Sequence, residues 1–337
     1  MANYSLNNRR YLGNKFKLLD FISEIIEKEK ITFSSFCDIF AGTGVVGNFF
    51  NKKNIKVISN DILEANFVSL VTFLKATKKD FEKIPEYIEH LNNLKTTKKD
   101  NYVSINYGDK YFDYNNAIRI GEIREEIERM NLKPIEKNIL LSSLVYSIDK
   151  IANTCGHYAA FRKKMSKYPE IKLNIPEINF ESNLNNEIYK EDANILVSKI
   201  NPDVIYLDPP YNSRQYFNSY HVLENIVKWN KPELEGITKQ IKDRSKYKSE
   251  YCSNNAYNVF SDLIQKANCK YLIVSYNNTG EKLDARSNSK LSDTQIIEIL
   301  SKKGKVTIHE KDYKYYTAGK NNNIKEHKER LYVCKVK

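Results

Sequence analysis

The sequence predicts an α/β fold, in which a Rossmann-like, mostly parallel sheet is interrupted by a large and mainly helical insertion. Near the N-terminus, an apolar segment at residues 35–40 leads into a glycine-rich turn, a short helical segment and a second apolar segment at residues 55–59. This order is typical of a βαβ unit. After a long stretch without such alternation, a buried-type strand at residues 203–208 meets two prolines, and helix and strand alternate again.

Hydrophobic periodicity and turn residues predict the individual elements. In chain order we expect helices over 15–30, 45–51, 122–130, 135–152 and 257–267, and strands over 35–40, 55–59, 203–208 and 270–275. The segments 305–309 and 330–335 predict a C-terminal antiparallel hairpin around a polar loop at 319–328. The basic segment 239–248 carries no signal for regular structure, and a solvated loop and a nucleic-acid contact are equal alternatives for it.

The composition excludes several classes of protein. With 41% hydrophobic and 12% aromatic residues, the 337-residue chain can build a core, so wholesale disorder is excluded. No run approaches the roughly 18 apolar residues of a membrane-spanning helix, and the N-terminal segment lacks a signal-peptide core, so we expect a cytoplasmic protein. Five scattered cysteines indicate neither a disulfide framework nor a zinc site. The net charge of +12 favours a polyanionic partner.

A glycine-rich turn follows the first predicted strand. The run from Gly42 to Gly47 fits the pattern G-x-G-x-x-G, and Asp61 ends the next strand, near the offset at which an acid binds ribose hydroxyls. This pattern alone also fits a nicotinamide dehydrogenase. However, Asp38 adds a carboxylate beside the turn, which would repel a pyrophosphate and attract an ammonium or sulfonium group. We interpret the turn as a nucleoside-cofactor site, with a plain βα turn as the alternative.

A second motif, Asp208-Pro209-Pro210-Tyr211, follows a predicted strand and should lie at the carboxyl edge, where open α/β sheets bind ligands. The two prolines fix the backbone, so that a carbonyl and the Asp208 side chain can face a pocket, and Tyr211 offers a flat ring for stacking. Methylation of an exocyclic amine requires acceptors for the amine hydrogens and a stacked, extruded base. The tetrapeptide provides both, which favours a functional role over a chance sequence.

Together these motifs resemble the Dam-like, alpha-order adenine-N6 DNA methyltransferases of restriction-modification systems. The segment from Arg10 to Lys15 also resembles the N-terminal cofactor element of that family, although Asn14 stands where a second glycine is common. The resemblance implies S-adenosylmethionine as cofactor, chemistry without a metal, and Asp208, Pro209, Pro210 and Tyr211 as catalytic residues. It implies that the cofactor is bound by Tyr11, Lys15, Asp38, Phe40, Ala41, Gly42, Thr43, Gly44, Asp61, Ile62, Asp192, Ala193 and Asp208.

The resemblance further implies that the insertion recognises DNA. We expect a catalytic domain in two parts, residues 1–75 and 188–337, around a target-recognition region at residues 76–187. Within that region, residues 156–164 combine aromatic side chains with cations, as is usual for DNA contacts. The residues expected to bind duplex DNA are Arg162, Lys163, Lys164, Arg214, Lys242, Arg244 and Lys246. A cognate restriction endonuclease is a candidate partner, and the choice between monomer and dimer stays open.

The expected reaction is therefore methyl transfer from S-adenosylmethionine to N6 of a flipped-out adenine in duplex DNA, by a bacterial or phage-encoded enzyme. One alternative is methylation of RNA adenine or of a protein glutamine amide; Asp rather than Asn at 208 and the basic insertion favour DNA. A dehydrogenase would have no use for the tetrapeptide, and a silent DNA-binding subunit would not need its acidic and aromatic positions together. His221 could be a general base, but we favour a histidine with satisfied hydrogen bonds near a helix start.

Overall fold

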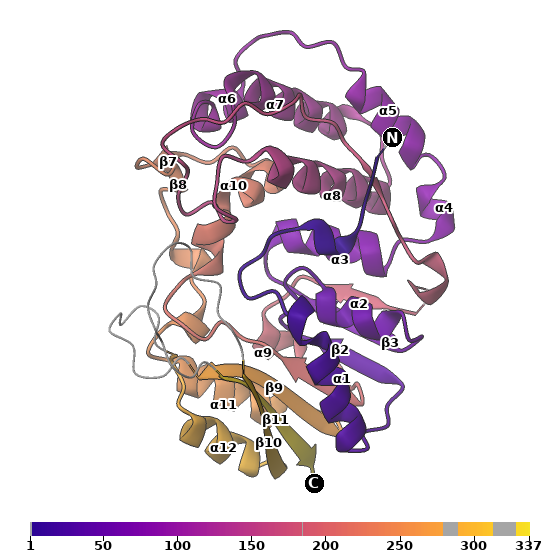
Figure 1. Cartoon of the computed structure of the whole chain (residues 1–337), viewed down its shortest axis with the longest axis vertical. Coiled ribbons are helices and arrows are strands. Elements are labelled where there is room, and N and C mark those ends of the chain that lie inside the picture. The colour runs from indigo at the N-terminus through magenta and orange to yellow at the C-terminus, as the bar shows by residue number, and fades with distance from the viewer. Residues whose placement is uncertain (1, 184, 279–288, 313–327) are drawn as a thin grey trace.

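The computed structural model describes residues 2–183, 185–278, 289–312 and 328–337. Within these residues one central sheet, in the lower half of Figure 1, contains seven strands in the order β10–β11–β9–β6–β2–β3–β5. The strands span Ser35–Asp38 (β2), Lys56–Asn60 (β3), Glu187–Tyr189 (β5), Val204–Leu207 (β6), Tyr271–Asn278 (β9), Gly304–Asp312 (β10) and Lys328–Val336 (β11). Neighbouring strands from β5 to β9 run parallel, whereas β11 is antiparallel to β9 and to β10. The predicted mixed α/β fold with a mostly parallel sheet is therefore confirmed.

The strand order brings the two sequence motifs together. β2 pairs with β3 on one side and with β6 on the other, so that Cys37 lies opposite both Ile58 and Ile205. Because these three strands are parallel, their carboxyl ends meet at one edge of the sheet. These ends lead into the glycine-rich turn, into Asp61 and into Asp208. Open α/β sheets bind ligands in the crevice outside the carboxyl ends of their strands, at the point where the strand order reverses.

Helices cover both faces of the sheet, which explains the continuous apolar character of its inner strands. Val204 and Tyr206 of β6 belong to one core, together with α1 (Leu19–Lys28), α2 (Val45–Asn51) and α3 (Glu64–Leu74). Ile205 and Leu207 belong to a second core on the opposite face, since side chains alternate along a strand. The helices on that face are α9 (Ala193–Leu196), α11 (Ala256–Lys266) and α12 (Asp293–Ser301).

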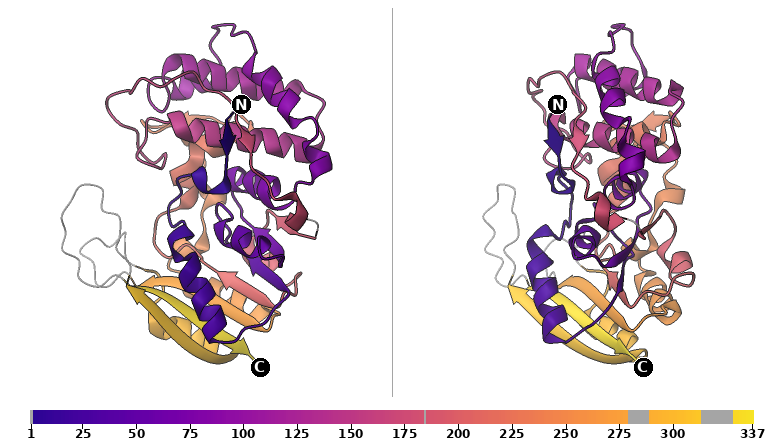
Figure 2. Two further views of the ribbon diagram at one scale, coloured as in Figure 1. Left: turned by 45° about the vertical axis from the view of Figure 1, so that its right-hand side comes forward. Right: turned by 90° about the vertical axis from the view of Figure 1, so that its right-hand side faces the viewer.

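A second region, here called the helical region, lies beyond α3. It forms the upper part of the molecule in Figure 1 and in both views of Figure 2. It consists of α4 (Lys78–Phe81), α5 (Ile84–Asn92), α6 (Tyr102–Tyr107), α7 (Tyr114–Arg129) and α8 (Pro134–Ile151), joined by α10 (Tyr216–Lys228) and by the strands β7 (Leu234–Glu235) and β8 (Gln240–Ile241). A short parallel pair, β1 (Asn3–Tyr4) and β4 (Ile175–Pro176), ties the N-terminus to it. α3 packs against both α8 and α10, so the helical region shares the first core.

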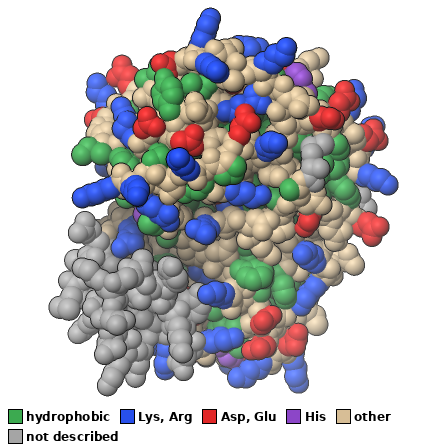
Figure 3. All heavy atoms as spheres, turned by 45° about the horizontal axis from the view of Figure 1, so that its top comes forward, with side chains coloured by type: hydrophobic (Ala, Val, Ile, Leu, Met, Phe, Trp, Pro, Cys, Tyr) green, Lys and Arg blue, Asp and Glu red, His purple; other side chains and the backbone are tan. Residues whose placement is uncertain are grey.

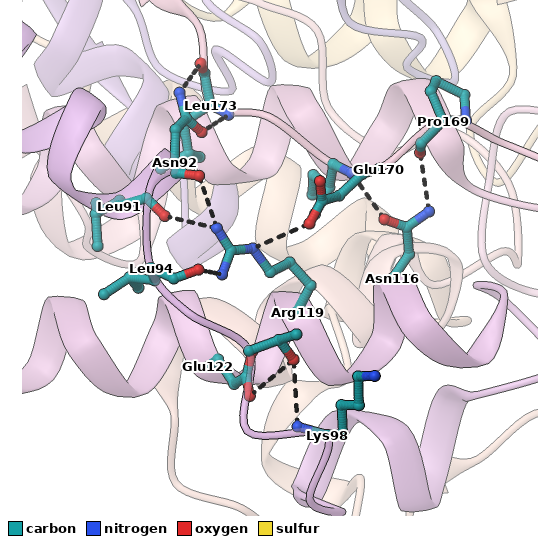
Figure 4. Close-up of polar contacts among 12 residues, drawn as sticks. Leu91, Asn92, Leu94, Lys98, Asn116, Arg119, Glu122, Pro169, Glu170 and Leu173 are labelled. Atoms are coloured by element: carbon teal, nitrogen blue, oxygen red, sulfur yellow. Dashed lines mark hydrogen bonds and ion pairs between the residues drawn. The ribbon is translucent and has the colours of Figure 1, made fainter.

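A buried arginine joins parts of the helical region (Figure 4). Arg119 of α7 donates hydrogen bonds to the carbonyls of Leu91, Asn92 and Leu94 at the end of α5, with a distance of 2.8 Å to Asn92. Its Nε also lies 3.7 Å from the carboxylate of Glu170. The last carbonyls of a helix have no partner within that helix. Arg119 therefore completes the C-terminus of α5 from a neighbouring helix.

The structure confirms most of the predicted elements and corrects several. The C-terminal hairpin is β10–β11, and most of its polar loop lies outside the described residues. The helix expected at 122–130 begins earlier, at Tyr114, where the Asp113 side chain accepts a hydrogen bond from the next turn. The helices α3 to α6, α9, α10 and α12 and the edge strand β5 were not expected. The segment 239–248 contains β8 and a 3-10 turn. Among the described residues, no helix is both long and apolar enough to cross a membrane.

Candidate active site

A cavity of about 630 Å³ lies at the carboxyl ends of β2, β3 and β6. Its walls come from the N-terminal segment, the turn after β2, the end of β3, the start of α9 and the segments after β6. Of the residues expected at cofactor and catalytic positions, it is lined by Tyr11, Lys15, Asp38, Phe40, Ala41, Gly42, Thr43, Asp61, Ile62, Asp192, Ala193, Asp208 and Pro210. Gly44, Pro209 and Tyr211 are not among the lining residues.

Asp38 ends β2 at the bottom of this cavity. Its side chain is 1% exposed, and Oδ1 has no hydrogen-bond partner. Burial, reinforced by the nearby Asp208 carboxylate, raises the pKa of Asp38 to about 8, although a hydrogen bond from the Gly47 backbone opposes the rise. An unpaired buried carboxylate is costly, and such perturbed groups concentrate at functional sites. The geometry thus fits a cationic ligand group beside Asp38.

The glycines of the turn have two different physical roles. Gly42 and Gly44 have φ of +54° and +83°, in the left-handed region that favours glycine. A Cβ on Gly42 would lie 3.1 Å from the Tyr11 ring, so the missing side chain keeps the cavity open there. A Cβ on Gly44 would lie 2.5 Å from Leu70 of α3. Gly44 therefore serves the packing of α2 and α3 behind the cavity, which explains its absence from the lining.

Asp61 follows β3 and is held in place by the backbone. Oδ2 accepts a hydrogen bond from the Gly42 N–H at 2.9 Å, and Oδ1 accepts one from the Leu63 N–H at 2.9 Å. Burial raises the pKa of Asp61 to about 6, and these hydrogen bonds limit the rise. A carboxylate has about four acceptor sites, so both oxygens can still accept hydroxyl hydrogens. The next residue, Ile62, is 62% exposed and offers the cavity a flat apolar surface.

Tyr11 closes one side of the cavity within an aromatic stack. Its ring lies 4.6 Å from the ring of Tyr220 and 5.6 Å from that of Tyr216, both on α10. Its hydroxyl accepts a hydrogen bond from Asn66 Nδ2 at 3.0 Å, and the Asn66 carbonyl accepts one from buried Arg9 at 2.9 Å. The N-terminal segment is therefore fixed against α3 and α10, although sequence reasoning missed Arg9, Asn66 and α10.

Lys15 connects the N-terminal segment to the tetrapeptide. Its Nζ lies 2.9 Å from Asp208 Oδ2 and donates a hydrogen bond to the Gly13 carbonyl at 3.2 Å. Burial acts to lower the pKa of the Lys15 ammonium, but Asp208 and Glu329 outweigh it, so the pKa is raised well above its ordinary value. Lys15 is therefore a permanent cation that fixes one oxygen of Asp208.

The rest of the tetrapeptide is supported from β9. The Tyr211 carbonyl accepts hydrogen bonds from the Tyr276 hydroxyl at 3.3 Å and from the Lys290 N–H at 2.8 Å. The Tyr211 ring contacts the Tyr276 ring edge-on, with 5.9 Å between centroids. These contacts hold the backbone after Pro210, the tetrapeptide proline in the cavity lining.

Asp192 and Phe40 also line the cavity. The Asp192 side chain caps α9 by accepting hydrogen bonds from the N–H groups of Asn194 and Ile195. The Phe40 ring lies 5.1 Å from the ring of Tyr251, whose hydroxyl donates to Asn194 Oδ1 at 2.6 Å. This wall combines an acceptor with aromatic surface, which suits a nucleobase.

Residues after the tetrapeptide build a further wall, in which the return of segment 246–251 to the cavity was not expected. Gln215 exchanges two hydrogen bonds with the Ser249 backbone, through Nε2 at 3.2 Å and Oε1 at 2.8 Å. This pairing folds the segment 246–251 back over the cavity, which it lines together with Tyr216 and Phe217. The only sequence signal was the basic and aromatic composition of this segment.

The residues expected to bind DNA form two groups. Arg162, Lys163 and Lys164 are exposed in the segment 156–164, and Arg214 is exposed nearby, close enough to lower the pKa of His157 together with burial. The others follow the strands β7 and β8. Lys242 and Arg244 form ion pairs with Glu233 and Glu235, whereas Lys246 lines the cavity. Figure 3 shows basic side chains across most of one face, with acidic side chains interspersed.

His221 lies inside the helical region and does not line the cavity. Both ring nitrogens lie near backbone carbonyls, Nδ1 at 3.1 Å from Asn218 and Nε2 at 2.7 Å from Thr238. Burial lowers the pKa of His221 to about 4, so the ring is neutral near pH 7. Gln240 Nε2 lies 3.0 Å from Nδ1, so the neutral ring can donate from Nε2 to Thr238 and accept at Nδ1 from Gln240. The preferred interpretation, a histidine with satisfied hydrogen bonds, is supported, although two of its partners lie outside α10. Among the described residues, no group of three or more His, Cys, Asp or Glu side chains is placed to hold a metal ion.

Comparisons with known proteins agree with this geometry. Residues 11–282 match the family model of the D12 class N6 adenine-specific DNA methyltransferases. The chain is 35% identical to modification methylase StsI of Streptococcus sanguinis, over 95% of this chain and 50% of that protein. It is 34% identical to type II methyltransferase M.FokI of Planomicrobium okeanokoites, over 83% of this chain and 46% of that protein.

These two relatives are therefore about twice as long as the matched chain. Type II methyltransferase M.NlaIII of Neisseria lactamica, by contrast, is covered over 94% of its length, at 32% identity over 93% of this chain. The family match spans both the turn after β2 and the tetrapeptide after β6. The chain belongs to the D12 class of N6 adenine-specific DNA methyltransferases.

Proposed function

We propose that this chain transfers a methyl group from S-adenosylmethionine to N6 of an adenine flipped out of duplex DNA. The observation that carries the proposal is a single cavity lined by Asp38, Asp61 and Asp208, in which Lys15 joins the N-terminal segment to Asp208 at 2.9 Å. The cofactor turn and the tetrapeptide thus face the same space. Family membership supports the reaction type.

The residues around the turn fit S-adenosylmethionine. The unpaired Oδ1 of Asp38 is suited to the ammonium of its amino-acid part, and Asp61 is suited to its ribose hydroxyls. Phe40 and Ile62 offer apolar surface for its adenine, and Asp192 offers an acceptor. When bound, the cofactor supplies an electrophilic methyl group on its sulfonium sulfur.

Asp208 and the Pro209 carbonyl accept hydrogen bonds from the target amine. This directs the nitrogen lone pair toward the methyl group and raises its nucleophilicity. Because Lys15 holds Oδ2 of Asp208, the orientation of the carboxylate is fixed and Oδ1 is left to face the amine. No strong base is required, since the amine loses its proton after attack. Orientation of the reacting groups accounts for most of the acceleration.

Tyr211 stacks on the extruded adenine in this proposal. The Tyr211 backbone is held by Tyr276 and Lys290 directly after Pro210, which lines the cavity. Extrusion is necessary because the N6 amine cannot be reached inside a duplex.

We assign duplex-DNA recognition to the inserted region at residues 76–187, within a catalytic domain formed by residues 1–75 and 188–337. The exposed cations of segment 156–164 bind phosphates, with Arg214, Lys242, Arg244 and Lys246 on the tetrapeptide side. The relatives are named modification methylases and type II methyltransferases, which supports a role beside a restriction endonuclease.

The test uses tritiated S-adenosylmethionine with mixed-sequence duplex DNA, RNA and a denatured protein mixture as separate substrates. After digestion and chromatography, we expect label in N6-methyladenine from DNA. If the label appears in RNA adenine or in glutamine instead, the substrate is RNA or protein and not DNA. No transfer to any of them would overturn the proposed activity.

A further inference from the structure

The hairpin β7–β8 presents an isolated apolar side chain to solvent. Its four-residue turn contains Ile237, which is 80% exposed and is the most exposed large apolar side chain in the described part of the chain. Single exposed apolar residues are common on protein surfaces. Three further features distinguish this one: a rigid turn, its location and its charged surroundings.

The turn is held firmly although its tip is exposed. Lys239 N–H closes it by donating to the Gly236 carbonyl at 3.2 Å. On the inner side, the Thr238 carbonyl accepts hydrogen bonds from His221 Nε2 at 2.7 Å and from the Tyr111 hydroxyl at 3.0 Å. Ile237 is therefore displayed on a fixed support, which lowers the entropy lost when it becomes buried in a partner.

The same anchors connect the turn to the predicted DNA-binding surface and to the active site. The Tyr111 hydroxyl lies 2.8 Å from the Tyr158 carbonyl in segment 156–164, so that segment and the turn are neighbours. His221 belongs to α10, whose first residues, Tyr216 and Phe217, line the cavity. The helix that follows the tetrapeptide thus carries the hairpin.

Basic side chains surround the hairpin. Lys242 and Arg244 follow β8, and their ion pairs with Glu233 and Glu235 are solvent-exposed, so phosphates can compete for the cations. Lys246 continues this basic run into the cavity lining. An apolar tip between cations is complementary to nucleic acid, in which stacked bases lie between phosphates.

We propose that Ile237 is an apolar wedge that enters the DNA stack next to the adenine being extruded. This inference rests on the proposed function and adds a DNA-binding element after the tetrapeptide, outside the insertion at 76–187. Apolar side chains between base steps unstack DNA and favour its deformation. Ile237 would fill the space that the extruded adenine leaves and so slow its return.

The test compares Ile237→Ala with Ile308→Ala, a control at an exposed isoleucine on β10. The target site is first mapped on plasmid methylated by the wild-type enzyme. Single-turnover methylation is then measured on a short duplex carrying that site and on the same duplex with an abasic site opposite the adenine. Extrusion costs least when the base is already unpaired.

On the fully paired duplex, we expect Ile237→Ala to methylate roughly tenfold more slowly than the wild type. On the duplex with the abasic site, its rate should fall by less than about threefold. Ile308→Ala should match the wild type on both. An unchanged rate, or an equal loss on both duplexes, would overturn the wedge. If Ile237→Ala instead alters self-association in light scattering, the tip binds a second copy and the proposal is wrong. If the wild type methylates no DNA, the proposed function itself fails.

Discussion

The cavity end of the sheet and the helical region differ in how their buried charged side chains are hydrogen-bonded. At the cavity, Asp38 is buried with an unpaired oxygen and a pKa raised to about 8. In the helical region, Arg119 and Arg124 of α7 donate to the last carbonyls of α5 and α10, with Arg124 Nε 2.8 Å from the Ile226 carbonyl. The two arginines bond carbonyls at helix ends and so hold helices together, whereas the unpartnered oxygen of Asp38 is left to bind a ligand.

This contrast predicts that the cavity end tolerates the least change. Gly44→Ala should lower the free energy of unfolding by about 3 kcal/mol, since it adds backbone strain to a clash with Leu70. Gly236→Ala is the matched control, because Gly236 also has a positive φ, +69°, but no atom stands within 4 Å of its Cβ position. Gly236→Ala should lower the free energy of unfolding, measured by urea denaturation, by about 1 kcal/mol. Equal losses would show that packing behind the turn is unimportant.

In the helical region, Arg119→Met should lower the free energy of unfolding by about 2 kcal/mol, because the carbonyls at the end of α5 lose their donors. Arg129→Met on the same helix is the control: Arg129 is exposed, and its change should stay within about 0.5 kcal/mol. Calorimetric affinity for S-adenosylmethionine should be unchanged in both variants. A weaker affinity in Arg119→Met alone would mean that the two regions are coupled.

The raised pKa of Asp38 predicts proton release when S-adenosylmethionine binds. Below pH 8 Asp38 is mostly protonated, while the cofactor's ammonium favours the ionised form, so affinity should rise from pH 6.5 to about 8 by up to about tenfold per pH unit. Above that range the cofactor's own amine loses its proton. At pH 7, calorimetry in buffers of different ionisation enthalpy should detect nearly one released proton, and Asp38→Asn should abolish it. If Asp38→Asn releases as many protons as the wild type, the released proton comes from another group.

The sequence was informative at the cavity end because its signals are local. The glycines, Asp61 and the tetrapeptide each follow a strand and Asp38 ends one, and parallel strands bring such positions to one edge. The walls contributed by Gln215 and by segment 246–251 depend on a hydrogen-bonded return of the chain to the cavity. No local pattern encodes that return.

The helical region was less predictable for a related reason. The start of α7 lies in an Asn- and Tyr-rich stretch, where the Asp113 cap and tertiary packing override weak helical propensity. The support of Tyr11 by Asn66 and Arg9 links three distant segments, so residue spacing carries no trace of it.

The central claim is that one cavity holds two separable functions, cofactor binding at the turn after β2 and amine activation at Asp208. The most direct measurement combines calorimetric binding of S-adenosylmethionine with single-turnover methylation of DNA by Asp208→Ala, using Asp20→Ala on the exposed side of α1 as control. Because Asp208 also lies beside Asp38 and is expected to contact the cofactor, we predict cofactor affinity within about tenfold of the wild type and a loss of at least about 100-fold in methylation, with the control unchanged. Methylation that persists within about tenfold of the wild-type rate would contradict the claim.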